Sequence, residues 1–229
     1  MKKYIFALML MTLGLSSCTG DFLNMSPSDQ TTTKEAVTTL DDVKNAVNGL
    51  YALMASTYYY DASMFLYGDV KGDDMQPTYW SSGRTAYPFY FFDHSASVPN
   101  SGGLWGRPYY IIRNAFNILK AIDDGKVSGG EEQLNEYKGE ALACIALCYF
   151  DLTRVYGYPY AKDNGASPGV PLLDHAINYG ETVDRNSVAE CYDYIIDKLE
   201  TAIPLLSTSR NDGHINAYAA RALLARAYL

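Results

Sequence analysis

One segment limits the possible folds of this chain more than any other, namely the apolar stretch from Glu131 to Tyr156. It contains no proline, and its apolar side chains recur at the three- and four-residue spacing of an α-helix. They fall on two adjoining stripes, one made of Ala141, Ile145, Cys148, Leu152 and Val155 and the other of Leu142, Ala146, Tyr149 and Tyr156. A helix with so wide an apolar surface must be covered on two sides. The segment therefore predicts the central helix of an all-α protein.

Two helices are expected before this one. Apolar residues at helical spacing run from Val37 to Met54, and we place the start of the first helix at Lys34. Pro108 suits the first turn of a second helix, because proline lacks an N–H group that would be unpaired there in any case. The apolar stripe of that second helix ends at Ile122.

Two further helices are expected after it. Ser187 and Glu190 have the spacing of a capping box, which places the start of the fourth helix. Pro204 is expected to end or kink that helix. A fifth helix begins near Asn216. Between the third and fourth helices, residues 158–186 are rich in proline and glycine and predict a connector.

The third and fifth helices resemble each other in sequence. A shift of 79 residues superimposes Ala143, Ala146 and Tyr149 on Ala222, Ala225 and Tyr228. Small side chains at matching positions are typical of tetratricopeptide-like helix hairpins, here with long insertions, although an alanine-rich composition could also produce the match. The sequence stops at Leu229 inside an apolar helix, so we expect it to be the N-terminal part of a longer protein.

The first residues have the plan of a secretory signal. Two lysines precede an uncharged apolar run of about a dozen residues, which is too short to span a membrane. The following Leu-Ser-Ser-Cys resembles a bacterial lipobox, in which the cysteine receives a lipid. We expect residues 1–17 to be removed, Cys18 to be lipidated, and residues 18–33 to form a flexible stalk. An ordinary signal peptide with a chance cysteine is the alternative.

Charge and cysteine content exclude several classes of protein. Without the two signal lysines, 16 basic residues stand against 26 acidic ones, and no basic stripe is present, so nucleic acid is not an expected partner. The three cysteines after Cys18 are odd in number and the fold is not small, so we expect no disulfide scaffold. Cys144 and Cys148 lie one helical turn apart and could form half of a metal site. We interpret them instead as small buried side chains, and expect no metal and no cofactor.

The main functional signal lies in residues 57–104, where the helical pattern is lost and glycine and proline are frequent. Long irregular segments in compact domains usually carry function. Twelve of the 31 aromatic residues fall within residues 58–92. Aromatic rings on loops offer flat apolar faces, which suit the C–H faces of sugars while nearby polar groups bind their hydroxyls. We expect ligand contacts from Tyr79, Trp80, Tyr87, Asp73, Asp74 and Arg84.

Other roles of this aromatic insertion stay open. The rings could merely pack the insertion onto the helices, and Trp105, which opens a helix, is expected to pack in the core. Asp69, Asp73 and Asp74 could include a glycosidase pair, which needs two carboxyl groups at a fixed separation. The sequence contains no nucleophile elbow, zinc-binding helix motif or phosphate loop, so we expect the protein not to be an enzyme.

Several stretches together resemble the N-terminal half of the SusD/RagB family of outer-membrane lipoproteins from Bacteroidetes. The resemblance begins at Cys18 and continues to the last residue, and it is interrupted mainly in the aromatic insertion. It is carried by residues 18–23, Pro27, and residues 48–51, 104–117, 141–159, 169–172, 185–192 and 216–229. It assigns residues 34–229 to a SusD-like N-terminal helical domain.

The resemblance implies a function. A family member would be anchored on the outer face of the outer membrane and would cap a SusC-type TonB-dependent transporter. It would capture nutrient oligosaccharides, or peptides as in the RagB branch, without cleaving them. A lipid-anchored glycosidase and a purely structural repeat adaptor are the other hypotheses. The ligand-binding insertions of the family vary, so the resemblance indicates a region of this chain and not individual residues.

Overall fold

The computed structural model describes residues 37–72, 75–76, 78, 86–93, 103–178 and 180–229. Within these ranges the regular elements are helices, and β-pairing is limited to two isolated bridges, so the expected all-α fold is confirmed. No helix in this part of the chain is long and apolar enough to cross a membrane. The elements are α2 (Leu40–Met54), α3 (Ser63–Tyr67), α4 (Ala86–Tyr90), α5 (Gly103–Asp123), α6 (Glu131–Tyr156), η3 (Tyr160–Lys162), α7 (Val188–Ala202), η4 (Ile203–Leu205) and α8 (Ala217–Tyr228).

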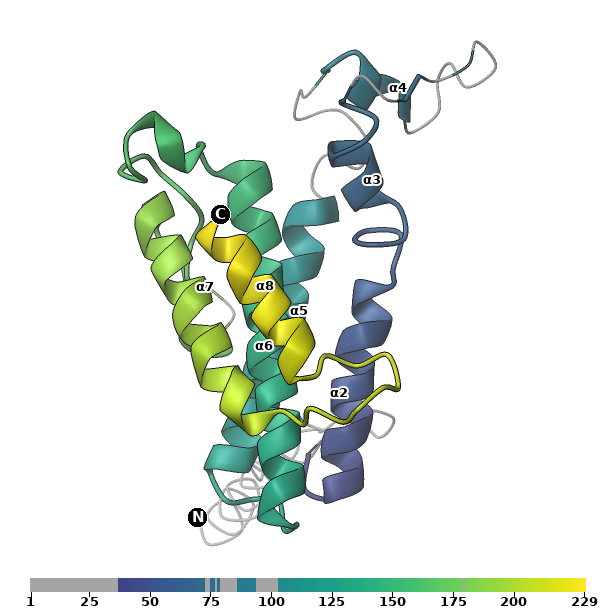
Figure 1. Ribbon diagram of the computed structural model, residues 1–229, viewed down its shortest axis with the longest axis vertical. Coiled ribbons are helices and arrows are strands. Elements are labelled where there is room, and N and C mark those ends of the chain that lie inside the picture. Colours follow the sequence, from purple (N-terminus) through teal and green to yellow (C-terminus); the bar gives the residue numbers. More distant parts are fainter. Residues whose placement is uncertain (1–36, 73–74, 77, 79–85, 94–102, 179) are drawn as a thin grey trace, which may run out of the picture. The chain divides into compact units, whose positions relative to one another are not determined.

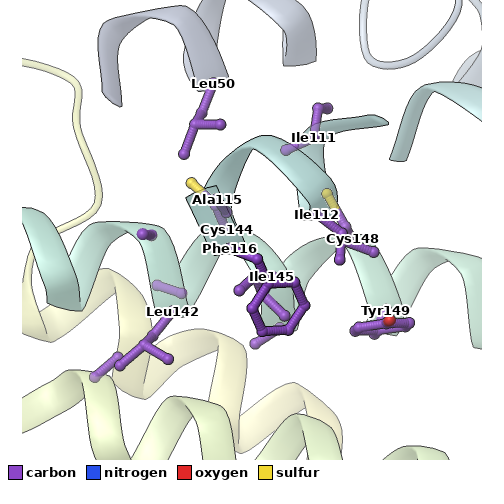
Figure 2. Close-up of a cluster of buried hydrophobic side chains, with 14 of the residues drawn as sticks. Leu50, Ile111, Ile112, Ala115, Phe116, Leu142, Cys144, Ile145, Cys148 and Tyr149 are labelled. Carbon is purple, nitrogen blue, oxygen red and sulfur yellow. The ribbon is translucent and has the colours of Figure 1, made fainter. Parts of the chain in front are cut away.

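Helix α6 is the centre of the fold, and its bounds are those that the sequence predicted. Helices α2, α5, α7 and α8 all pack against it (Figure 1). Its middle part is therefore buried around nearly the whole circumference, as the two apolar stripes require. Figure 2 shows Cys144 and Cys148 among the aliphatic and aromatic side chains of this core. The interpretation of these thiols as small buried side chains is confirmed, and burial raises the pKa of both.

The helices pair as hairpins, as the tetratricopeptide-like prediction requires. α5 packs on α6, α7 packs on α8, and α6 also packs on α7. The two helices that superimpose in sequence, α6 and α8, are thus the second members of two hairpins. Gly139 allows the close approach between α6 and the end of η4, because a Cβ atom there would lie only 3.1 Å from Cβ of Leu205 and 2.9 Å from Cγ of Leu206, the residue after η4.

Two helix starts differ from the prediction. Val37 and Thr38 are not helical, and α2 begins at Leu40 rather than near Lys34, which lies outside the described residues. Its start is fixed by a capping box, in which Asp42 N donates to Oγ1 of Thr39 (3.1 Å) and Thr39 N donates to Oδ2 of Asp42 (2.9 Å). This pair satisfies backbone N–H groups that would otherwise lack partners.

Helix α5 begins at Gly103, so Pro108 lies inside the helix and not in its first turn. Proline cannot donate a hydrogen bond to the carbonyl group four residues earlier, that of Leu104. Only one turn of helix precedes Pro108, which limits the disruption to the N-terminal end of α5.

The predicted start of α7 is confirmed. Glu190 N donates to Oγ of Ser187 (3.2 Å), and Ser187 N donates to Oε2 of Glu190 (2.7 Å). At the other end, Pro204 lies in the short helix η4, where the α-helix stops as expected. Helix α8 begins at Ala217, with Asn216 as its N-terminal cap, also as predicted.

The loop before α8 is held by a carboxylate buried in α6. Glu140 is fully buried, and its oxygens accept hydrogen bonds from the hydroxyl of Tyr51 (2.7 Å) and from the guanidinium of Arg210. Nδ1 of His214 lies 2.7 Å from the same carboxylate. A buried charge is tolerated only with such partners. The cluster therefore fixes the loop against both α2 and α6.

Candidate functional site

The candidate site is the aromatic insertion at residues 57–104, which the structure describes in part. Of the predicted ligand-binding residues, Tyr87 lies on α4 with a half-buried side chain. Its role in ligand binding stays a prediction. The other predicted ligand-binding residues and the lipidation site lie outside the described residues, so their roles stay predictions as well: Asp73, Asp74, Tyr79, Trp80, Arg84 and Cys18.

The expectation that this insertion is free of helix is wrong in three places. Helices α3 and α4 form within it, and α5 already begins at Gly103. α3 and α4 have five residues each, too few for a repeated apolar stripe, so their periodicity could not reveal them. Contacts between elements hold them instead, because the buried ring of Phe89 on α4 packs against Tyr67 on α3 at a centroid distance of 4.9 Å.

The start of the insertion is tied to the core through Asp151 of α6. The hydroxyl groups of Tyr59 and Tyr60 donate to Oδ2 of this carboxylate at 2.7 and 2.6 Å. Nη2 of Arg154 donates to Oδ1 at 2.5 Å. Burial raises the pKa of both tyrosines, so their hydroxyls stay protonated and act as donors. The base of the insertion is therefore a fixed structure.

Outside this base the insertion exposes aromatic rings. Tyr58 is 47% exposed, Phe65 53%, Phe91 59% and Phe92 62%. On α4, the ring of Tyr87 meets that of Phe91 at a centroid distance of 4.7 Å. Exposed aromatic surface of this kind is typical of binding sites.

Two cations lie over rings of this surface. Nζ of Lys71 is 5.5 Å from the ring centroid of Tyr67 and 6.0 Å from that of Phe92. The guanidinium of Arg107, on α5, is 5.3 Å from the ring centroid of Tyr58. Such cations add hydrogen-bond donors to apolar ring faces. The combination suits a ligand that presents both C–H faces and hydroxyl or carboxylate oxygens.

A row of rings connects the insertion to the helical core. Phe89 meets Tyr67, Tyr67 meets Tyr156 of α6 at 6.0 Å, and Tyr156 meets Trp105 of α5 at 5.0 Å and a right angle. The hydroxyls of Tyr156 and Tyr67 lie 3.4 Å apart. Trp105 is half-buried and packs against the core, which agrees with its expected role, but part of its ring stays accessible.

Sequence reasoning missed the residues of α6 that hold the insertion. Asp151 and Tyr156 lie about 90 positions from their partners, and no local pattern links them. One signal was available for Asp151. Burying an acidic side chain in an apolar helical stretch costs free energy unless hydrogen-bond or ion-pair partners compensate. Such a residue is therefore expected to have a structural or functional role.

Comparison with known proteins identifies the family. A family model described as "Starch-binding associating with outer membrane", of the SusD-like type, matches residues 21–229. The chain belongs to this SusD-like family. A SusD-like protein of Bacteroides ovatus is 24% identical over 233 aligned positions, which cover all of this chain and 39% of that protein.

Solved structures agree with this assignment. A SusD superfamily protein from Bacteroides vulgatus is 54% identical with a TM-score of 0.79, over 84% of this chain and 43% of that one. A laminarin-binding SusD-like protein has a TM-score of 0.65 at 20% identity, over 82% of this chain and 39% of that one; this second likeness concerns the fold alone. The chain thus spans less than half the length of these relatives.

Proposed function

We propose that this SusD-like chain is part of a cell-surface lipoprotein that captures oligosaccharides and passes them to a TonB-dependent transporter of the outer membrane. The observation that carries the proposal is the match of residues 21–229 to a family described as starch-binding and outer-membrane associated. The exposed rings of the insertion supply what such a ligand needs, because sugar C–H faces stack on aromatic rings.

The base of the insertion favours binding of this kind. A ligand surface binds more tightly when little of it must be ordered on binding. The three hydrogen bonds to Asp151 and the contact between the rings of Tyr59 and Tyr60, at 4.4 Å, hold the base in one arrangement before any ligand arrives. Lys71 and Arg107 lie beside the exposed rings and are placed to bind sugar oxygens.

We further propose that the protein binds its ligand without hydrolysing it. Glycoside hydrolysis requires two accessible carboxyl groups across the scissile bond. The two buried carboxylates of the described chain, Asp151 and Glu140, are 1% and 0% exposed. Asp151 accepts from two tyrosine hydroxyls and a guanidinium, and Glu140 accepts from one tyrosine hydroxyl and a guanidinium. Both are therefore committed to the structure of the core.

Calorimetric titration of the complete protein tests this proposal. We expect binding of starch or laminarin oligosaccharides, with no release of shorter products. Tyr87→Ala should weaken binding, whereas Tyr218→Ala should not, because Tyr218 is an exposed ring on α8, outside the insertion. Product release would refute the non-catalytic role. Binding of peptides and of no glycan would favour the peptide-binding alternative.

The lipid anchor is tested separately. Cys18→Ala removes the thiol that would carry the lipid, so the protein should move from the outer-membrane fraction to the soluble fraction. Ser16→Ala is the matched control, because it changes the same segment and keeps the thiol. A Cys18→Ala protein that stays with the membrane would contradict the anchor. Co-purification of the lipidated protein with an outer-membrane transporter tests the proposed partner.

A further inference from the structure

A groove of about 430 Å³ lies where α5 meets the connector between α6 and α7. This volume falls in the range of small-molecule sites, roughly 300–1,000 Å³. None of its lining residues belongs to the predicted site. They are Trp105, Gly106, Tyr109, Tyr110 and Arg113 on α5, and Pro171, Leu173, Ile177 and Val183 on the connector. We call this feature the α5 groove.

The walls of the α5 groove are held by hydrogen bonds and ring contacts. The hydroxyl of Tyr109 donates to the carbonyl of Pro171 at 2.8 Å. The carbonyl of Leu173 accepts from the hydroxyl of Tyr194 at 2.7 Å. On the α5 side, the ring of Trp105 is held at right angles to Tyr156. Both walls are thus fixed in place, which lowers the cost of binding a ligand between them.

Gly106 leaves a gap in the surface of α5. Gly106 lines the groove one helical turn before Tyr110, which lines it as well. A Cβ atom at Gly106 would meet no described atom within 4 Å. Glycine is unfavourable inside a helix, and no packing contact in the described structure calls for it here. The position therefore leaves open space in the groove beside Tyr110, whose side chain is 49% exposed.

The chemistry of the α5 groove matches that of a sugar unit. Tyr110 offers accessible ring surface for C–H groups. The half-buried ring of Trp105 lines the same groove, with the Arg185 guanidinium 5.3 Å from its centroid. Arg113 lines the groove, is exposed, and has no ion pair among the described residues, so its guanidinium is available to sugar oxygens. The ring row through Tyr67 and Tyr156 ends at Trp105, which connects this groove with the aromatic insertion.

We propose that the α5 groove is a second carbohydrate subsite, which binds one unit of an oligosaccharide whose other units contact the aromatic insertion. This inference rests on the proposed carbohydrate-binding function and extends it. It predicts that affinity rises with oligosaccharide length until the chain reaches the groove.

Gly106→Leu tests this subsite, because a leucine side chain there would fill the groove. The substitution also raises helix propensity, so it should not destabilise α5. Gly49→Leu is the matched control, since Gly49 lies inside α2 and a Cβ atom there also meets nothing within 4 Å. The complete protein is titrated with starch and laminarin oligosaccharides of two to about eight units. We expect Gly106→Leu to bind the longest oligosaccharides with a roughly tenfold higher Kd, which corresponds to a loss of about 1.4 kcal/mol in binding free energy. Binding of the shortest ones, and all binding by Gly49→Leu, should match the wild type.

The outcomes separate the two proposals. If the wild type binds oligosaccharides and Gly106→Leu binds all of them equally well, the subsite is refuted while the proposed function stands. If the wild type binds none, both fail. If Gly106→Leu does not fold, Tyr110→Ala and Arg113→Ala provide the same test on exposed side chains. Loss of transporter binding with unchanged glycan affinity would show a protein contact and refute the carbohydrate subsite.

Discussion

Asp151 offers the sharpest test of how the insertion is joined to the helical core. Its carboxylate is 1% exposed and accepts hydrogen bonds from Tyr59, Tyr60 and Arg154. The substitution Asp151→Ala removes the shared acceptor and leaves three donors behind. The hydroxyl of Tyr59 is fully buried, so water cannot replace the lost bond there.

The expected cost follows from these contacts. A hydrogen bond to a charged group contributes about 1.5–3 kcal/mol, and breaking a buried ion pair costs about 3–5 kcal/mol. The side chain of Arg154 is 37% exposed, so water can solvate it after the substitution. The three losses therefore do not add in full. We expect Asp151→Ala to lower the free energy of unfolding by about 3–5 kcal/mol.

Urea titration followed by circular dichroism measures this change, and a double-mutant cycle isolates its cause. Tyr59→Phe alone should cost about 1–2 kcal/mol. In the Asp151→Ala background, Tyr59→Phe should cost almost nothing, because the hydroxyl that it removes no longer has its acceptor. The cycle should therefore give a coupling energy of about 1–2 kcal/mol. A cost of Asp151→Ala below about 1 kcal/mol, or additive effects, would refute the proposed role of this carboxylate.

Two further predictions concern the packing and capping of the helices. Gly139→Val should lower the free energy of unfolding by about 1–3 kcal/mol in the same urea assay, because its Cβ atom would meet Leu206 at 2.9 Å. Hydrogen bonds from the backbone N–H and hydroxyl of Ser187 lower the pKa of Glu190. Its stabilising effect is present above the pKa of the unfolded chain and is lost as pH falls through the lower, folded value. Glu190→Gln should remove this contribution to the pH dependence of the melting temperature, measured in thermal melts between about pH 3 and 6.

The helices that could be predicted are those with a long apolar stripe or a capping signature. The bounds of α6 and the start of α7 follow directly from such patterns. The start of α2 was misplaced although the same kind of signature was present, because Val37 continues the apolar spacing beyond the capping box at Thr39 and Asp42. Local hydrogen bonding there takes precedence over periodicity.

The candidate site could be predicted as a region and not as a set of contacts. The density of rings in residues 58–92 is visible in the sequence, but their partners on α6 are not, since Asp151 and Tyr156 belong to a helix whose pattern indicates only a core. The α5 groove was missed for a related reason. Its walls come from α5 and from a connector about 60 residues later, which are joined through tyrosine hydroxyls and not through any shared motif.

Helix α6 links these observations. Its apolar stripes pack against the helices of both hairpins. Its two buried carboxylates bind two irregular segments of the chain. Glu140 binds the loop before α8, and Asp151 binds the start of the aromatic insertion. Because the insertion is fixed at its base by side chains of the core, we expect exposed residues beyond the base to tolerate substitution without loss of the fold. A scaffold of this kind can present different ring surfaces to different ligands, which explains why the core was predictable and the ligand contacts were not.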